Sequence, residues 1–186
     1  FTTLSERKLP FDVVFILNRF FEAAGREIEA AGGWIGGYAG DGLLALFTHP
    51  DGIAPACRSA FAAAGAVDRA VTDLNRQLAA ELPTALRMAM GLHAGPLVLG
   101  RLGYGASRGR SVIGPAVNLA SRLESLAKAA DVQIVASSEA ATRAGIGLDG
   151  LRVETVAVRG VAAPLPVIYA ARAGDLAGRL GSRASA

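Results

Sequence analysis

The segment VIGPAVNLASRL, residues 112–123, changes from a strand pattern to a helix pattern at one glycine. Gly114 ends an apolar run, and Pro115 follows at the first helical position, where no amide hydrogen is needed. Asn118 and Arg122 are four residues apart, so a helix places an amide and a guanidinium side by side on one face. Such a pair suits a negatively charged ligand, because arginine presents a fork of donors to phosphate. The same pair is also common on solvated helix faces, so the pair alone does not show that this face binds a ligand.

A second segment, residues 34–47, predicts a strand, a tight turn and another strand. Tyr38 and the run from Leu43 to Phe47 favour strands, and the glycines around Asp41 favour a turn. An aspartate on a turn most often bonds its own backbone. Its alternative role is that of an oxygen ligand for a hard cation such as Mg²⁺. One aspartate does not decide between the two roles.

Hydrophobic periodicity along the rest of the chain predicts helices that alternate with strands and hairpins. We expect helices over residues 10–31, 51–80, 115–128 and 137–144, and strands up to residue 47, over 86–103 with a turn near 95–96, and near 132–136, 151–158 and 165–171. The glycine-rich, basic stretch 103–110 predicts a mobile loop, and the residues after Arg172 predict a frayed tail. The pattern indicates an α+β sandwich with helices over one face of a mixed sheet.

Composition fits one globular domain and excludes several classes of protein. With 52% hydrophobic and 19% charged residues, the 186 residues bury a substantial core and do not form a disordered chain. The net charge of +3 is mild and its basic residues are scattered, which argues against a nucleic-acid-binding surface. Cys57 is the only cysteine, so no disulfide forms within the chain. No run approaches the roughly 20 apolar residues of a membrane span, and Phe1 does not begin a signal peptide pattern.

The order and spacing of these segments resemble the catalytic domain of the class III nucleotidyl cyclases, the family of adenylyl and guanylyl cyclases. The resembling segments are residues 1–6, 13–21, 32–47, 91–95, 112–123, 158–161 and 164–169. Each match is modest, but they follow the family's order from Phe1 to about Tyr169. The resemblance implies a ferredoxin-like, mixed or antiparallel sheet covered by helices. It implies a catalytic domain over residues 1–171, whose first strand lies upstream of Phe1, and a flexible tail over residues 172–186.

The resemblance also implies a reaction, in which the ribose 3′-hydroxyl of a nucleoside triphosphate attacks the α-phosphorus and releases pyrophosphate and a cyclic nucleotide. Two divalent ions, Mg²⁺ or Mn²⁺, activate the hydroxyl and neutralise the leaving phosphates. Asp41 matches the second of the family's two metal-binding aspartates, and the first belongs upstream of Phe1. Asn118 and Arg122 match the catalytic pair that orients the ribose and stabilises charge on the α-phosphate.

Further positions match the family's contacts to the phosphates. The backbone amides of Phe1, Thr2 and Thr3 match the loop that cradles the triphosphate. Arg159 is at the position where the family commonly has a lysine that contacts the terminal phosphates, and arginine keeps the charge and adds a second donor. The alternative for Arg159 is a surface arginine at the end of a strand.

Gly37 and Ser111 match the two positions at which the family reads the purine base. Adenylyl cyclases usually have a lysine at the first position and guanylyl cyclases a glutamate, whereas Gly37 has no side chain with which to read a base. At the second position adenylyl cyclases usually have aspartate or threonine, and guanylyl cyclases cysteine. Serine is nearest to threonine, because its hydroxyl both donates and accepts. We therefore expect ATP as the substrate.

The resemblance implies a partner, because in this family the metal-binding aspartates come from one chain and the asparagine and arginine from the other. We expect a head-to-tail homodimer with two shared sites. The expected role is production of cyclic AMP in intracellular signalling, in the cytoplasm, with membrane contact only through a segment upstream of Phe1. Two alternatives stay open. One is a weak or inactive cyclase-like domain that serves as a dimerising regulatory module, favoured by Gly37. The other is a cyclase that uses GTP or both nucleotides. We expect His93 and His49 to be structural.

Overall fold

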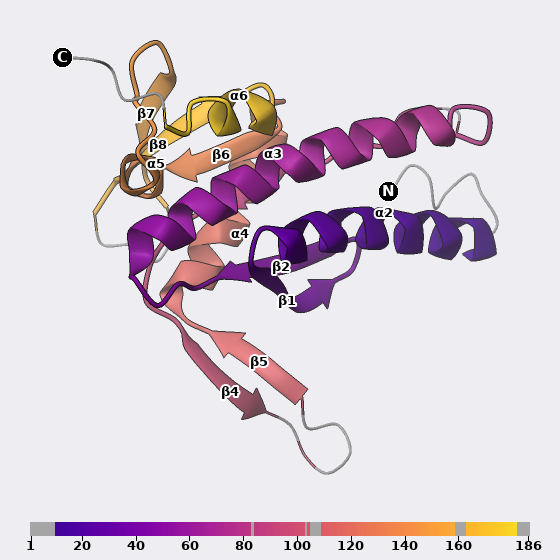
Figure 1. Cartoon of the computed structure of the whole chain (residues 1–186), viewed down its shortest axis with the longest axis horizontal. Coiled ribbons are helices and arrows are strands. Elements are labelled where there is room, and N and C mark those ends of the chain that lie inside the picture. Colours follow the sequence, from indigo (N-terminus) through magenta and orange to yellow (C-terminus); the bar gives the residue numbers. More distant parts are fainter. Residues whose placement is uncertain (1–9, 83, 103, 105–108, 159–162, 182–186) are drawn as a thin grey trace.

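The computed structural model describes residues 10–82, 84–102, 104, 109–158 and 163–181. Phe1, Thr2, Thr3 and Arg159, which the sequence predicts to contact phosphates, lie outside the described residues. The helices are α2 (Pro10–Ala30), α3 (Ile53–Gln77), α4 (Pro115–Ala129), α5 (Ser138–Ala144) and α6 (Ala173–Ala177). The strands are β1 (Gly33–Ala39), β2 (Gly42–Phe47), β3 (Met90–Leu92), β4 (Val98–Leu102), β5 (Gly109–Ile113), β6 (Ile134–Ser137), β7 (Arg152–Val156) and β8 (Leu165–Ala170), as Figure 1 shows. None of the helices in these ranges is both long and apolar enough to cross a membrane.

A four-stranded sheet with the order β3-β6-β8-β7 forms the centre of the fold. β3 runs parallel to β6, whereas β8 runs antiparallel to both β6 and β7. β6 is buried along its whole length. The predicted α+β class with a mixed sheet is therefore confirmed.

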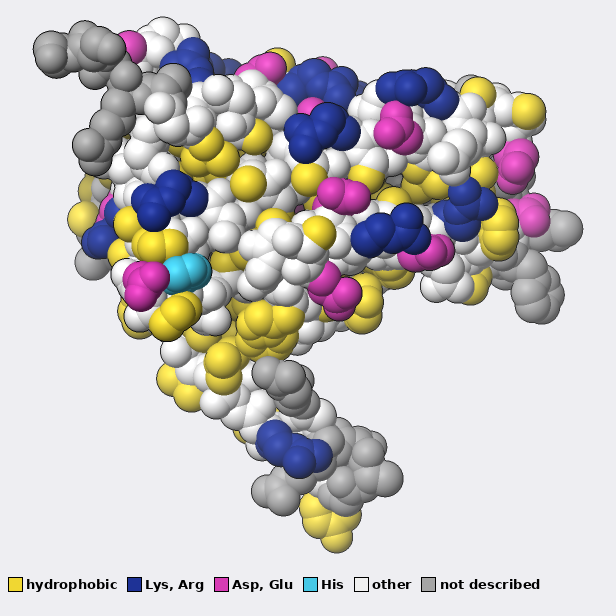
Figure 2. Space-filling model, viewed as in Figure 1, with side chains coloured by type: hydrophobic (Ala, Val, Ile, Leu, Met, Phe, Trp, Pro, Cys, Tyr) yellow, Lys and Arg dark blue, Asp and Glu magenta, His cyan; other side chains and the backbone are white. Residues whose placement is uncertain are grey.

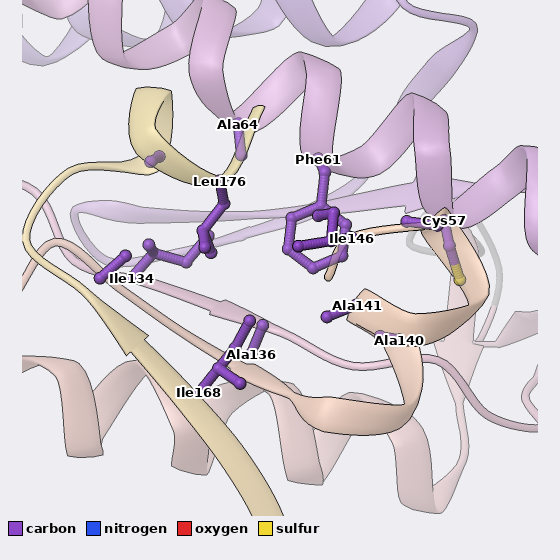
Figure 3. Close-up of a cluster of buried hydrophobic side chains, with 13 residues drawn as sticks. Cys57, Phe61, Ala64, Ile134, Ala136, Ala140, Ala141, Ile146, Ile168 and Leu176 are labelled. Atoms are coloured by element: carbon purple, nitrogen blue, oxygen red, sulfur yellow. The ribbon is translucent and has the colours of Figure 1, made fainter. Parts of the chain in front are cut away.

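Helices cover both faces of this sheet. On one face, Leu176 of α6 lies beside Ile134 of β6, and Phe61 of α3 belongs to the same cluster of buried side chains (Figure 3). On the other face, α4 packs through a second cluster that contains Leu123, Ala127, Val135, Val167 and Tyr169. Successive residues of a strand point to opposite faces, so Ile134 and Ala136 of β6 belong to one apolar cluster and Val135 to the other. The prediction of helices over one face is therefore wrong, because the sheet has two apolar faces to cover.

The β1–β2 hairpin packs against α2 and α3 and forms a separate two-stranded sheet. Its antiparallel register is interrupted by a bulge between Ile35 and Gly37. Ile35, Leu43 and Ala45 pack against apolar side chains of the two helices, namely Ala24, Ile28, Val67 and Val71. The turn at Gly40 and Asp41 therefore lies at the end of a hairpin that two long helices support.

Strands β4 and β5 pair with each other and form an arm that projects away from the rest of the molecule (Figure 1). Large apolar side chains are exposed on it, namely Val98, Leu99, Leu102 and Ile113. β5 begins at Gly109, so residues 109–110 belong to a strand and not to the predicted loop. Residues 103 and 105–108 of that loop lie outside the described residues.

The sequence predicts a frayed tail from Arg172 onward, whereas residues 173–177 form α6. Leu176 is fully buried in the core between α3 and the sheet. Gly65 of α3 allows this close approach, because a methyl group there would overlap α6. Arg172 donates two hydrogen bonds to the carboxylate of Asp68, which is 3% exposed. The small residues of this segment therefore reflect close helix packing, and the prediction fails for its described part.

Candidate active site

Asp41 occupies the turn of the β1–β2 hairpin and is exposed. Gly40 has a φ of +60°, a conformation that glycine adopts without strain. No hydrogen bond or ion pair between Asp41 and another described residue is present. Its charge nevertheless reaches the last turn of α4, where the pKa of Lys128 is raised, chiefly by a hydrogen bond to Glu124 and to a smaller extent by Asp41. The predicted metal ligand is thus an accessible carboxylate near one end of α4.

Helix α4 presents Asn118 and Arg122 on a face that does not contribute to the core. The helix begins directly after Gly114 with Pro115 in its first turn, as the sequence predicts. Its buried positions are Ala116, Leu119, Leu123 and Ala127, which recur at helical spacing and pack on the sheet side. Asn118 is exposed and Arg122 half-buried, and within the described part of the chain neither side chain has a hydrogen-bond or ion-pair partner. Both side chains are therefore free to bind a ligand.

Gly91 of β3 fixes how closely α4 lies against the sheet. A methyl group on Gly91 would overlap the carbonyl oxygen of Ala120 and the amide nitrogen of Glu124. The backbones of strand and helix are thus in direct contact at the turn that lies between Asn118 and Arg122. Only glycine permits this approach, so Gly91 sets the position of the predicted catalytic pair.

The Asp41 carboxylate fits the chemistry of a Mg²⁺ or Mn²⁺ ligand, because these hard ions prefer oxygen donors. No cluster of three or more His, Cys, Asp or Glu side chains that could hold a metal is found among the described residues. Asp41 therefore fits as one ligand of such an ion. The remaining ligands would be phosphate oxygens, water or residues outside the described ranges.

Ser111, one of the two predicted base-reading residues, lines a pocket of about 550 Å³ between β1 and the β4–β5 arm. The pocket is also lined by Trp34, Leu99, Gly100 and Arg101. Trp34 and Arg101 are not among the site residues that the sequence predicts. A usable signal was present, since Trp34 is the only tryptophan and lies in the same predicted strand as Gly37. Arg101 could not be found in this way, because it reaches the pocket only through the pairing of β4 with β5.

Gly37, the other predicted base-reading position, opens onto empty space, since a methyl group there would meet no atom within 4 Å. The neighbouring Gly36 lies against β5, because a methyl group at Gly36 would be 3.2 Å from Cγ2 of Val112. Val112 directly follows Ser111 in the chain. The two predicted base-reading positions therefore lie on neighbouring strands, and Ser111 lines the pocket whereas Gly37 does not.

The predicted residues fall into two separate groups within one chain. Neither Asn118 nor Arg122 bonds to Asp41, although all three residues are described. Asp41 is at the hairpin turn, whereas Asn118 and Arg122 are on the first half of α4. One chain by itself thus does not join the metal ligand to the catalytic pair through any direct contact.

A second hollow, of about 460 Å³, lies between α2 and α3. Arginine and acidic side chains alternate over these helices, as Figure 2 shows. Arg26 pairs with Glu22 within α2, and Arg19 donates to Gln77 of α3. None of the predicted site residues that the structure describes lines this hollow, and its charges are of both signs. The pocket beside Ser111 is therefore the better candidate for a ligand site.

Comparison with known proteins gives a consistent result. A family model described as the adenylate and guanylate cyclase catalytic domain matches residues 1–163. An adenylate cyclase of Anabaena cylindrica is 33% identical over 129 residues, which is 69% of this chain and 25% of that protein. Adenylate cyclase 1 of Rhizobium meliloti is 32% identical over 138 residues, or 74% of this chain and 21% of that protein. The chain thus spans about a quarter of the length of these curated relatives.

The fold is also found among solved structures. The guanylyl cyclase Cya2 superposes with a TM-score of 0.78 at 29% sequence identity. The superposition covers 90% of this chain and 84% of that one. The overall fold of this chain is therefore similar to that of the guanylyl cyclase Cya2.

Proposed function

The chain belongs to the family of adenylate and guanylate cyclase catalytic domains, and we propose that it converts ATP to 3′,5′-cyclic AMP and pyrophosphate. The observation that carries the proposal is the family match over residues 1–163, and we propose that Asp41, Asn118 and Arg122 perform the family's metal-binding and catalytic roles within it. A domain used only for packing has no physical need of these three side chains together. We place the reaction in the cytoplasm, where nucleoside triphosphates are made and used.

The reaction forms a bond between the ribose 3′-oxygen and the α-phosphorus and breaks the bond from that phosphorus to the β-phosphate oxygen. Arg122 donates to the oxygens of the α-phosphate, where negative charge builds up in the transition state. Asn118 holds a ribose oxygen through its amide and so orients the attacking hydroxyl. The hydroxyl proton passes to solvent.

Asp41 would hold the divalent ions through its carboxylate oxygens. When bound, Mg²⁺ or Mn²⁺ lowers the pKa of the attacking hydroxyl and neutralises the leaving phosphates. We also propose that the backbone amides of Phe1, Thr2 and Thr3 bind the triphosphate and that Arg159 contacts its terminal phosphates. These four residues lie outside the described residues.

We propose that two copies of the chain share each site, with Asp41 from one copy and Asn118 and Arg122 from the other. The lack of contact between these residues within one chain supports this arrangement. The apolar arm supports it as well, because Val98 is 68% exposed and Tyr104 94% exposed. Exposed apolar patches of this kind are typical of protein interfaces. A head-to-tail pair would bury the arm and complete two sites at once.

Production of cyclic nucleotide by the purified protein tests the proposal. The assay uses the full-length protein, with ATP or GTP as substrate and with Mg²⁺ or Mn²⁺. We expect cyclic AMP from ATP. If a folded dimer makes no cyclic nucleotide from either substrate, the domain is a regulatory module, the alternative that the missing side chain at Gly37 favours.

A further inference from the structure

The carboxylate of Asp41 depends on the backbone of its turn for its position. Among the described residues it has no hydrogen-bond or ion-pair partner that would hold it. The turn is short, since β1 ends at Ala39 and β2 begins at Gly42. Gly40 adds no contact, because even a methyl group there would meet no atom within 4 Å. The orientation of the Asp41 carboxylate is therefore set by the contacts that hold the end of the hairpin.

Tyr38 is the last large side chain of β1 before this turn. It pairs with Leu43 across the hairpin, and residues that are directly opposed in an antiparallel pair share one face. Leu43 packs against apolar side chains of α2 and α3, so this face is the helix side of the hairpin. Gly37 pairs with Leu44 and lies on the opposite face. Tyr38 therefore faces the helices and not the predicted base-reading position.

The ring of Tyr38 contacts the ring of Phe21 on α2, which lies alongside the hairpin (Figure 1). The two ring centroids are 4.8 Å apart and the ring planes are tilted by 57°, within the favourable range for aromatic pairs. The ring of Phe21 in turn lies 5.6 Å from that of Phe20. Phe20 packs against the apolar clusters between α2 and α3. The chain of rings thus connects the end of the hairpin to the core.

The exposure of Tyr38 distinguishes it from a core residue. Tyr38 is 63% exposed, although it is large and aromatic. The stabilisation from burial is roughly proportional to the apolar area removed from water, so this ring contributes little to the core. Its contact with Phe21 acts locally, because it fastens the last residues of β1 to α2.

We propose that Tyr38 and Phe21 are positioning residues, whose ring contact holds the turn in the orientation in which Asp41 binds Mg²⁺ or Mn²⁺. This inference rests on the proposed function, since it concerns the metal ligand of the same site. Without the contact the turn samples further orientations. The apparent affinity for the ion then falls with the fraction of molecules in the binding-competent orientation. An aromatic pair of this geometry shifts such an equilibrium by about two- to tenfold.

Binding of Mn²⁺ to the full-length protein tests the inference, with the signal of the free ion followed by electron paramagnetic resonance. Tyr38→Ala is the main variant, because an exposed side chain can be truncated without opening a cavity in the core. We expect the Kd of Mn²⁺ to rise by about two- to tenfold. Phe21→Ala, which removes the other ring, should raise it to a similar extent. Tyr38→Phe keeps the ring without the hydroxyl and should bind Mn²⁺ as the wild type does.

Phe15→Ala is the matched control. Phe15 is also on α2 and is 51% exposed, and its ring lies against the guanidinium of Arg19. Among the described residues it has no ring contact with the hairpin, so its loss should leave the Kd of Mn²⁺ unchanged. Asp41→Ala removes the proposed ligand itself and should weaken Mn²⁺ binding more than any of the other variants. Circular dichroism checks that each variant is folded.

The outcomes separate this inference from the proposed function. Wild-type affinity for Mn²⁺ in Tyr38→Ala, together with weak binding in Asp41→Ala, would overturn the positioning role and leave the proposed function in place. An equal loss of affinity in Tyr38→Phe and Tyr38→Ala would also overturn it, because the hydroxyl and not the ring contact would then act. If Asp41→Ala binds Mn²⁺ as the wild type does, the metal-binding role of Asp41 in the proposed function fails, and the positioning role fails with it.

Discussion

A methyl group on Gly91 would overlap the carbonyl oxygen of Ala120, because β3 and α4 lie backbone against backbone at this point. Ala120 is midway between Asn118 and Arg122. The position of the proposed catalytic pair is therefore fixed by a residue that has no side chain and that lies on another element. A strand of three residues thus contributes to the proposed site through its backbone.

We predict that Gly91→Ala lowers the free energy of unfolding by roughly 3 kcal/mol, the upper range for overpacking, because backbone atoms cannot move aside as a side chain can. Gly25→Ala is the matched control, since Gly25 lies within α2 and a methyl group there would meet no atom within 4 Å. It should stabilise the protein by about 0.5–1 kcal/mol. Urea denaturation measures both changes. Equal free energies of unfolding for the two variants would show that the close packing of α4 against β3 does not require glycine at position 91.

Much of the fold could be predicted from the sequence, because its signals are local. The periodicity of residues 10–31 and 51–80, the glycines around Asp41 and the step from Gly114 to Pro115 predict elements that the structure forms at these places. The order of these segments was enough to indicate the family. The family match over residues 1–163 confirms that prediction.

What the sequence could not provide depends on contacts between distant residues. Arg172 donates a hydrogen bond to Asp68, which is 104 residues away in the sequence. Because this contact is not local, the sequence pattern after Arg172 predicts a tail and not a buried helix. Arg101 reaches the pocket only through the pairing of two strands. The roles of Asp41, Asn118 and Arg122 remain predictions, since the structure supplies their exposure but no ligand.

We predict that Asp41→Ala and Arg122→Ala each abolish cyclase activity in a homodimer, because every site then lacks one essential group. A mixture of the two variants should regain part of the activity. In a mixed dimer one of the two sites combines the intact Asp41 of one copy with the intact Arg122 of the other. The measurement is cyclic nucleotide formation after the variants are mixed and allowed to exchange subunits.

The control for this experiment is a mixture of Arg122→Ala with Asn118→Ala. In the proposed arrangement these two residues belong to the same half of a site, so no mixed dimer contains a complete one. This mixture should stay inactive. If the first mixture also stays inactive while light scattering shows dimers, the shared-site arrangement is wrong.

We predict that Asp68→Ala lowers the free energy of unfolding by about 1.5–3 kcal/mol, the usual contribution of hydrogen bonds to a charged group, because the carboxylate is buried whereas its partner Arg172 stays accessible to water. Asp68 accepts hydrogen bonds from Arg172, from Gln133 and from the backbone of Gly174, and all of these lose their acceptor. Arg143→Ala is the comparison, since it breaks an exposed pair with Glu139 and should cost below about 0.5 kcal/mol. Thermal or urea denaturation gives both values. A small effect at Asp68 would mean that α6 does not depend on this pair.

His93 lies at the end of β3, and its Nδ1 is 2.9 Å from Oγ of Ser137. Burial lowers the pKa of His93, and the charge of Glu139 opposes this effect. The hydrogen bonds also fit a neutral ring. Oγ of Ser137 accepts from the backbone of Ala140 at the start of α5, so its hydroxyl hydrogen can be donated to His93.

We therefore predict that the protein loses stability as the pH falls below about 6.5, the ordinary pKa of histidine. Because the pKa of His93 is lower in the folded state, the unfolded chain takes up its proton first. The contribution of His93 is complete above the unfolded pKa and is lost as the pH falls from there through the folded pKa, with a slope of at most about 1.4 kcal/mol per pH unit. Urea denaturation at pH values from about 8 to about 5 measures the contribution of His93 to the free energy of unfolding. His93→Gln should flatten the curve in this window, whereas His49→Gln, which changes an exposed histidine, should leave the contribution of His93 in place. An unchanged pH dependence in His93→Gln would show that other groups govern acid stability.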